Sequence, residues 1–216
     1  MKDIVTKECF YISDGGKVHF LYQKNEDVYA LVGSIRDING YSVYNSEDIT
    51  ELIIPNTING KELKYIDGST FECLHNLKKI VIEDDNKYFS LNNGGLYTKD
   101  MKELILMPPL YIDSCYRVKD GVETICDCSI ANSFMETLIL PEGCKVIEEY
   151  GITGSDNLKS VFLPKSIKVI GLKNFIFAPL TDIYYGGNES DREQIYNQFG
   201  EKMLLDEAIW HYNVQI

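Results

Sequence analysis

The chain has 216 residues, of which 44% are hydrophobic and 25% are charged, an ordinary composition for a folded globular protein. It contains no apolar run of about 18 residues, so no helical membrane span is expected. Its 33 acidic residues outnumber its 21 basic ones, and the resulting net charge of −12 repels nucleic-acid phosphates and anionic lipid surfaces. We therefore expect no nucleic acid partner and no membrane insertion.

Residues 1–48 are predicted to form an antiparallel N-terminal β cap. Apolar and polar residues alternate in KVHFLYQ and DVYALVGSI, as they do in half-buried strands, and the turn-forming sequences DGG and KNED border these runs. The beginning of the chain, MKDIVTKECFYISDGG, has no apolar core of about 7–15 residues such as a signal peptide needs. The location is therefore open between the cytoplasm and, after removal of a leader, the cell surface.

Six short runs with a shared pattern follow, and each is predicted to be a strand. Apolar residues occupy the second and fourth positions, a period of two that is typical of a strand with one buried face. The runs are ELIIP from Glu51, KIVIE from Lys79, ELILM from Glu103, TLILP from Thr137, SVFLP from Ser160 and DIYYG from Asp182. Their second residues lie 28, 24, 34, 23 and 22 residues apart, which indicates a repeat with an insertion in the longest step.

A second register supports the same repeat. The sequences KYIDGSTF, ETICDCSI, KVIEEYGI and KVIGLKNF each place an isoleucine five residues before another apolar residue. Because one coil buries only a few side chains, worth about 1.5–3 kcal/mol each, coils must stack on one another and their ends must be covered. The sequence therefore predicts a β-rich solenoid over residues 49–187 with a cap at each end.

Residues 188–216 are predicted to form the C-terminal cap, a short helix followed by a strand. Ser190 and Glu193 match a capping box, and the helix is expected to begin there and to end at Gly200. The apolar sequence EAIWHYNV predicts the final strand.

Candidates for catalysis or metal binding are sparse. None of His19, His75 and His211 has a partner at the spacing of metal ligands, and Cys126 and Cys128 are one residue apart rather than the two to four typical of zinc sites. We expect no metal, no cofactor and no catalytic residue, although a carboxylate pair for glycoside hydrolysis stays open because the sequence does not give its separation in space. The six cysteines are expected to be free thiols, since a chain of this length needs no disulfides.

The third residue of each run is predicted to point away from the core. It is apolar in all six runs, and strands stacked about 4.8 Å apart would bring these side chains into one exposed column. Such a stripe is typical of an interaction surface, although β-branched and aromatic residues also stabilise a sheet by packing across strands. We predict a binding column at Ile53, Val81, Ile105, Ile139, Phe162 and Tyr184, with Phe162 and Tyr184 as its anchors.

The sequences LKSVFLPKSIKVIG and TELIIPNTINGKELKYIDGSTFECLHNLKKIVI and the ending LTDIYYGGNESDREQI…AIWHYN resemble the BspA-like leucine-rich repeat proteins of bacteria. The stretch YFSLNNGGLYTKDMKELILMPP resembles the hairpin insertion of that family, so a hairpin is expected near residues 86–110. The likeness covers about residues 49–213 and implies a right-handed solenoid, a cell-surface or adhesive role and no catalytic residues. One departure is that the family's frequent alanine before the buried aromatic is replaced by Thr70, Ser129, Gly151 and Asn174.

These features together predict a non-enzymatic scaffold that binds a protein partner through the exposed sheet face, with adhesion to host or matrix proteins as the specific role. A carbohydrate-binding module is the alternative if the 15 tyrosines gather in a groove. A structural spacer without its own ligand is the other alternative, and it requires every face to be covered.

Overall fold

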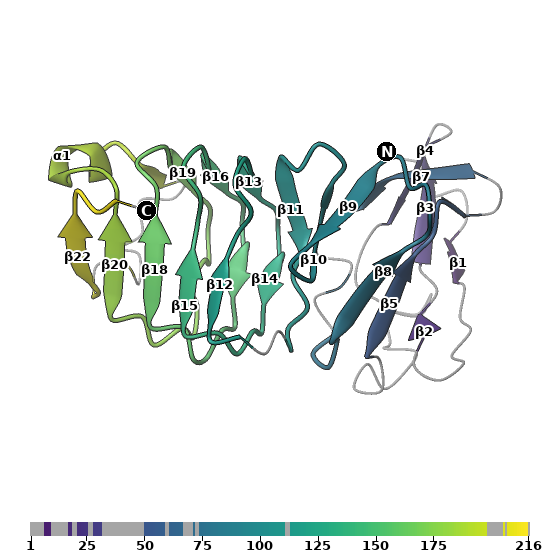
Figure 1. The fold of residues 1–216 in the computed structure, drawn as a ribbon, viewed down its shortest axis with the longest axis horizontal. Helices are drawn as coiled ribbons and strands as arrows, with labels where there is room; N and C mark the ends of the chain where they lie inside the picture. Colours follow the sequence, from purple (N-terminus) through teal and green to yellow (C-terminus); the bar gives the residue numbers. More distant parts are fainter. Residues whose placement is uncertain are drawn as a thin grey trace.

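The computed structural model shows an elongated array of short strands in which successive coils lie side by side (Figure 1). It describes residues 7–9, 17–18, 21–25, 28–31, 50–58, 61–66, 71, 74–110, 113–197, 205 and 207–215, and of residues 7–31, 58, 61 and 196–197 it describes the backbone alone. Much of the cap predicted for residues 1–48, and Gly200 at the predicted helix end, lie outside the described residues.

One sheet collects a strand from each successive coil of the C-terminal half, and we name it the ladder sheet. Its pairings are parallel throughout, and each strand pairs with the equivalent strand of the next coil, down to the last pair, in which Ile183 faces Trp210. The ladder sheet has the order β12 (Cys115–Arg117), β15 (Thr137–Ile139), β18 (Ser160–Leu163), β20 (Asp182–Tyr185) and β22 (Ile209–Tyr212).

A second sheet collects the next short strand of the coils, and we name it the hairpin sheet because an antiparallel hairpin forms one end of it. The hairpin lies within the stretch for which the sequence predicts one. Its strands are β9 (Phe89–Asn92), β10 (Gly95–Thr98), β11 (Glu103–Leu106), β13 (Thr124–Ile125), β16 (Val146–Ile147), β19 (Val169–Ile170) and β21 (Tyr196–Asn197). A third parallel pair completes two of the coils, β14 (Ile130–Ala131) and β17 (Ile152–Thr153).

The N-terminal half adds two further sheets. A parallel one, the N-terminal sheet, consists of β2 (Lys17–Val18), β5 (Glu51–Ile54) and β8 (Lys79–Ile82). The other has the order β1 (Lys7–Cys9), β3 (Leu21–Asn25), β4 (Val28–Leu31), β7 (Lys61–Ile66) and β6 (Thr57–Ile58). The strand β7 carries the first isoleucine of the second register, Ile66, which is buried as the sequence predicts.

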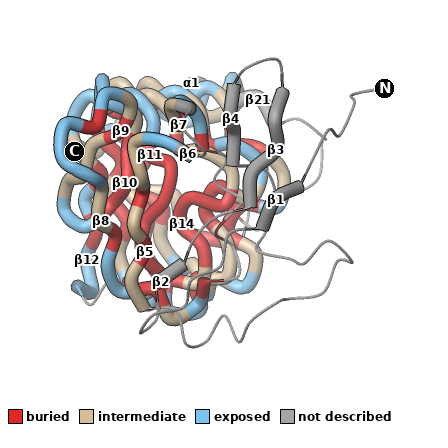
Figure 2. The backbone as a smooth tube through the Cα atoms, turned by 90° about the vertical axis from the view of Figure 1, so that its right-hand side faces the viewer, coloured by how far each residue is buried: buried red, intermediate tan, exposed pale blue. Residues whose placement is uncertain are grey.

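The inward side chains form the core, and the period of two explains which residues they are. In β18 and β20 the second and fourth residues are buried and the first and third are not. Figure 2 shows buried stretches along the inside of the array and exposed ones in the turns. Among the described residues the core divides into two clusters, one from Leu52 to Leu106 and one from Tyr97 to Ala208.

The run ELILM stacks with none of the other five runs, which themselves form two groups, β5 with β8 and β15 with β18 and β20, and this corrects the predicted repeat. Its Leu104 pairs with Ile125 in the hairpin sheet. Its Ile105 is buried at 3% exposure because it packs in the core cluster that also contains Phe89 and Leu96 of the hairpin. In the ladder sheet, the residue of the preceding strand that faces Leu138 is Tyr116 of β12. With Tyr116 in place of Leu104, the step to Leu138 is 22 residues, and the long step of 36 residues moves to the segment between Ile80 and Tyr116, which contains the hairpin.

The C-terminal helix also begins earlier than predicted. The helix α1 (Glu189–Arg192) is a single turn whose N-cap is Asn188, not Ser190. The Asn188 side chain accepts a hydrogen bond from the Asp191 N–H at 2.9 Å, and the Asp191 carboxylate accepts one from the Asn188 N–H at 3.0 Å. This is a complete capping box, and it precedes the expected one.

Buried polar side chains link neighbouring coils. Asn174 accepts a hydrogen bond from the Ile152 N–H and donates to the carbonyls of Glu148 and Gly171, each at 2.8 Å. One coil earlier, the hydroxyls of Ser133 and Ser155 lie 2.9 Å apart in the core. At Asn174, one of the four places where the family's frequent alanine is replaced, a polar side chain thus holds two coils together.

Candidate functional site

The outward side chains of the ladder sheet form one column across its five described strands. The residues that face one another in register are Arg117, Ile139, Phe162, Tyr184 and His211. Arg117 is exposed and the other four are half-buried, as expected for side chains that touch their neighbours on the open face of a sheet.

Three rings of this column stack face to face, and we name them the aromatic ladder: Phe162, Tyr184 and His211. The ring centroids of Phe162 and Tyr184 lie 4.4 Å apart and those of Tyr184 and His211 lie 4.6 Å apart, both at 12° between planes. These distances are close to the spacing of about 4.8 Å between strands, so the sheet itself sets the stack.

A hydrogen bond fixes the last ring of the aromatic ladder. His211 Nε2 lies 2.7 Å from Asp182 Oδ1, and the Thr181 hydroxyl donates to the same carboxylate at 2.7 Å. The His211 contact, followed by the Thr181 contact, holds the pKa of Asp182 below its ordinary value. The His211 ring is therefore held in place from the side while Tyr184 covers its face.

The inward side of β22 packs on the end of the core. Trp210 lies edge-on to Tyr185 at 5.9 Å between centroids, and its Nε1 donates to the Leu205 carbonyl at 2.9 Å. The Arg192 guanidinium lies 4.2 Å from the centroid of the Trp210 ring, a cation–π contact. Strand β22 is thus anchored from below, so the outward His211 has a rigid support.

The structure brings together half of the predicted binding column. Ile139, Phe162 and Tyr184 lie side by side on the ladder sheet, whereas Ile53 and Val81 face each other on the N-terminal sheet. Buried Ile105 belongs to neither group, so its prediction as an exposed residue is wrong. The predicted column of six is therefore one group of three residues, a separate pair and one buried residue.

Two residues of the column were missed from the sequence. His211 is in the ending AIWHYN, where a register match to DIYYG was available, although the step from Tyr184 to His211 is longer than the steps between the preceding ladder strands. Arg117 is the last residue of β12, a strand in which Tyr116 is the single buried residue, and this leaves no alternating signal to detect.

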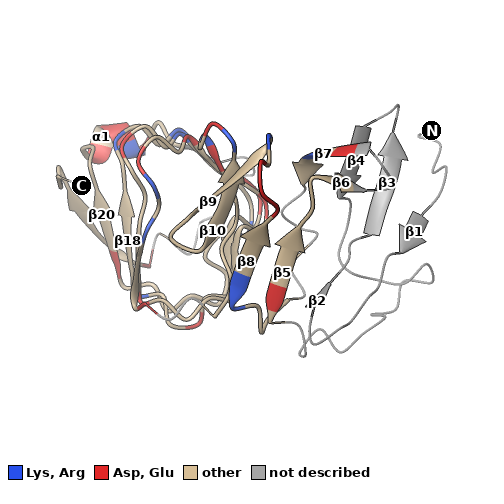
Figure 3. Cartoon of the chain, turned by 45° about the vertical axis from the view of Figure 1, so that its right-hand side comes forward, with Lys and Arg blue, Asp and Glu red and all other residues tan. Residues whose placement is uncertain are grey.

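Charges and thiols on the rest of the surface point to no other chemistry. Figure 3 shows Lys, Arg, Asp and Glu gathered in the turns rather than along most of β18 and β20. In the described part of the chain, no three His, Cys, Asp or Glu side chains are arranged to hold a metal ion. Of the described cysteines, Cys115 and Cys144 are free thiols, and burial raises the pKa of the Cys144 thiol to about 12. Across the same residues, no helix is long and apolar enough to cross a membrane.

A family comparison identifies the repeat. The family described as "BspA type Leucine rich repeat region" matches residues 16–106 and 115–198 in six copies. The chain belongs to the BspA type leucine-rich repeat family. The match begins inside the segment predicted as the N-terminal cap, and the parallel pairing of β2 with β5 lies in the same region. Solenoids of this kind present extended surfaces to other proteins, so membership suggests an interaction scaffold rather than an enzyme.

Solved structures agree with the BspA type assignment at the level of the fold. A leucine-rich repeat protein from Eubacterium ventriosum has a TM-score of 0.52 at 15% identity. The match covers 63% of this chain and 42% of that protein. Two further solved structures have lower TM-scores. The pneumococcal vaccine antigen PcpA has a TM-score of 0.47 at 16% identity, covering 76% of this chain and 51% of that one. A leucine rich cell surface protein from Faecalibacterium prausnitzii has a TM-score of 0.37 at 15% identity, covering 72% of this chain and 56% of that one. No curated protein sequence matches the chain.

Proposed function

We propose that this BspA type chain is a non-enzymatic scaffold that binds a protein partner through the outward face of the ladder sheet. The aromatic ladder is the observation that carries the proposal. Aromatic residues dominate the energetics of protein interfaces, and here each ring is held by its neighbours before any partner arrives. Because these side chains are already ordered, binding costs little side-chain entropy.

The residues beside the aromatic ladder give the face a suitable border. Two positions earlier in each strand, the same sheet presents a second outward column, Cys115, Thr137, Ser160, Asp182 and Ile209. Most of its members are polar, and Ile209 is 63% exposed at the edge strand. An apolar centre with a polar border is the usual arrangement of a protein interface.

The alternatives receive less support. A sugar-binding platform needs an open aromatic face, but Phe162 and Tyr184 cover each other and present their edges to solvent. A spacer requires a covered face, whereas the column of Ile139, Phe162 and Tyr184 is half-exposed. Binding of a protein is therefore the use that fits the geometry best.

The finer parts of the proposal rest on the family likeness. Adhesion to host or matrix proteins at the cell surface is the role we propose for the face. We also propose the division into an N-terminal cap (1–48), a solenoid (49–187) and a C-terminal cap (188–216), with the right-handed coiling typical of the family.

The test is a binding screen of the purified chain against matrix proteins and host-cell surfaces, with a Phe162→Thr/Tyr184→Thr variant beside it. Threonine keeps the strand propensity while removing both rings. If these rings are anchors that together contribute at least about 2 kcal/mol, the variant should bind at least about 30-fold more weakly.

The matched control is Ile53→Thr/Val81→Thr, the equivalent change at a facing pair on the N-terminal sheet. It should bind like the parent chain. Circular dichroism and thermal melts show whether each variant is folded. Equal affinities for the folded Phe162→Thr/Tyr184→Thr variant and the parent chain would refute the proposal, and no binding by any of the chains would favour the spacer.

A further inference from the structure

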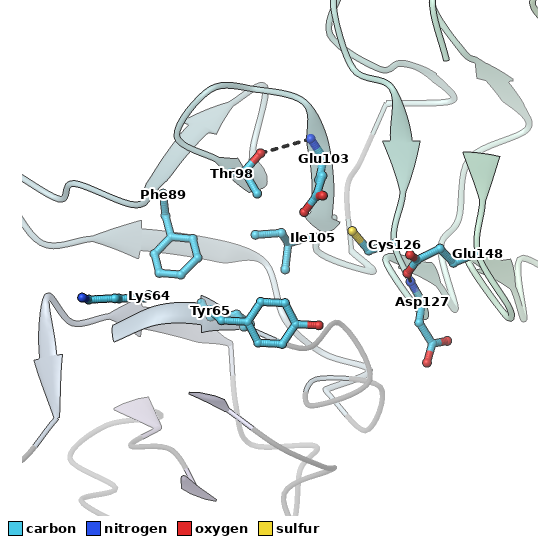
Figure 4. Close-up of a pocket in the computed structure, with 10 residues that line it drawn as sticks. Lys64, Tyr65, Phe89, Thr98, Glu103, Ile105, Cys126, Asp127 and Glu148 are labelled. Atoms are coloured by element: carbon cyan, nitrogen blue, oxygen red, sulfur yellow. Dashed lines mark hydrogen bonds between the residues drawn. The ribbon is translucent and has the colours of Figure 1, made fainter. Parts of the chain in front are cut away.

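A pocket of about 340 Å³ lies away from the aromatic ladder, where β7, the β9–β10 hairpin and β11 meet the turns after β13 and β16 (Figure 4). Its size is at the small end of the range for ligand pockets, about 300–1,000 Å³, and suits one side chain better than a large cofactor. The lining residues are Lys64, Tyr65, Ile66, Phe89, Thr98, Glu103, Ile105, Cys126, Asp127 and Glu148.

One end of the pocket is apolar. Figure 4 shows the ring of Tyr65 beside Ile105, with Phe89 to their left. Phe89 and Ile105 are buried, whereas Tyr65 is 54% exposed and forms the outer wall. This end can hold an aliphatic stem between an aromatic ring and a branched side chain.

The other end is acidic, with Glu103 and Glu148 as its main charges. Burial raises the pKa of Glu103, and the nearby charges of Glu148 and Asp100 raise it further. Glu148 Oε2 accepts a hydrogen bond from the Asp127 N–H at 3.0 Å, but within the described residues no lysine, arginine or histidine forms an ion pair with Glu103 or Glu148. Two carboxylates therefore face the same small space, and no described residue supplies a cation to either of them.

Elsewhere on the coils, carboxylates do have cationic neighbours. Glu123 lies between two lysines, and Glu136 pairs with Lys159 at 3.2 Å. The lysine of the pocket, Lys64, points away from its acidic end in Figure 4, and its ammonium lies 3.5 Å from Glu62. The missing positive charge in the pocket is thus a local feature, and the net charge of −12 attracts a cationic partner toward it.

We propose that this pocket binds an arginine side chain of a protein partner. The stem lies between Tyr65 and Ile105, and the guanidinium lies at the end formed by Glu103 and Glu148. A planar, permanently charged guanidinium can serve two carboxylates at once and can stack on an aromatic ring, which a lysine ammonium does less well. The proposal concerns a different surface from the aromatic ladder and stands independently of it.

The test is an NMR titration of the full chain with N-acetyl-arginine methylamide, compared with N-acetyl-citrulline methylamide, which has the same shape without the charge. The arginine probe should shift the amide resonances of Tyr65, Glu103 and Asp127 with a millimolar dissociation constant. The citrulline probe should bind at least fivefold more weakly. Equal shifts from the two probes would overturn the proposal. The absence of shifts at these residues up to a probe concentration of about 50 mM would overturn it as well.

Two variants complete the test. Glu103→Gln should weaken binding of the arginine probe at least fivefold, and its folding is not at risk because Glu103 is exposed and glutamine has nearly the same shape. Glu136→Gln, a carboxylate change outside the pocket, should leave binding unchanged. Unaltered binding by Glu103→Gln, or equal binding of N-acetyl-lysine methylamide by the parent chain, would overturn the assignment of arginine.

A last comparison separates this site from the proposed function. The Phe162→Thr/Tyr184→Thr variant should bind the arginine probe as the parent chain does, whatever happens to its binding of protein partners.

Discussion

Replacing Asn174 with alanine should destabilise the chain by about 2–3 kcal/mol, because this side chain links two coils inside the core. Asn174 is 8% exposed and makes three hydrogen bonds of 2.8 Å. The Glu148 carbonyl keeps a second partner, the Gly151 N–H at 3.1 Å, so the truncation leaves mainly the Ile152 N–H and the Gly171 carbonyl unsatisfied. Each buried unsatisfied group costs about 1–3 kcal/mol, and the carbonyl belongs at the low end of that range.

Thermal and urea unfolding measure the effect. For a chain of this size, 1 kcal/mol corresponds to about 2–4 °C, so the Tm should fall by roughly 4–12 °C. Asn157→Ala is the matched control, since Asn157 is an exposed asparagine in a turn and its truncation should change stability by less than about 0.5 kcal/mol. Hydrogen exchange at the Ile152 amide should also become faster. If Asn174→Ala and Asn157→Ala melted within about 2 °C of each other, the reasoning would be refuted.

Three further predictions concern single residues. Gly171→Ala should cost about 1–3 kcal/mol in urea unfolding, because its Cβ would lie 2.6 Å from the Glu149 backbone nitrogen, and a loss under about 0.5 kcal/mol would contradict this. Phe177→Gly should stabilise the chain by about 0.5–1 kcal/mol, because Phe177 is 79% exposed and its φ of 66° is strained for any residue except glycine. Phe177→Ala keeps that backbone strain and should show no such stabilisation. Glu123 accepts hydrogen bonds from Lys102 and Lys145 at 2.5 Å each, and these lower its pKa to about 2. Its contribution to folding stability is therefore fully present above the unfolded pKa of about 4.3 and is lost as the pH falls through about 2. An NMR titration should show that low pKa and its rise in about 1 M salt, where the Debye length is about 3 Å, and an unchanged value would contradict the ion pairing.

The strands themselves could be predicted from the sequence because their cause is local. Alternation places Leu52 and Ile54, or Val161 and Leu163, on one side of a strand, and all four are buried. Strand pairing is not local. The run with Ile105 has the same pattern as the others, but the hairpin that packs beside it takes its edge, and that competition depends on which segments meet in space.

The helix start shows a different limit. Asn188 with Asp191 and Ser190 with Glu193 are two overlapping capping patterns, and asparagine and serine are about equally good N-caps. The sequence does not rank them, and the earlier one forms.

The candidate site divides in the same way. The contact between Phe162 and Tyr184 follows from the regular spacing of the repeat and could be predicted. The acidic pocket could not, because it is built from residues on β7, β9, β10 and β11 and from two later turns, which come together through packing. Glu103 has no feature in the sequence that marks it as unpaired.

Successive coils are related by a repeated displacement along the array, because each strand of the ladder sheet meets the next in the same parallel arrangement. One more coil would add about 4.8 Å to the ladder sheet and would meet its neighbour in the register that the existing coils already use. Duplication or loss of a coil therefore leaves the packing of the others in place. The length of such a protein can evolve by changes in the number of coils. Substitutions at the outward positions of a coil change which partner groups that coil contacts.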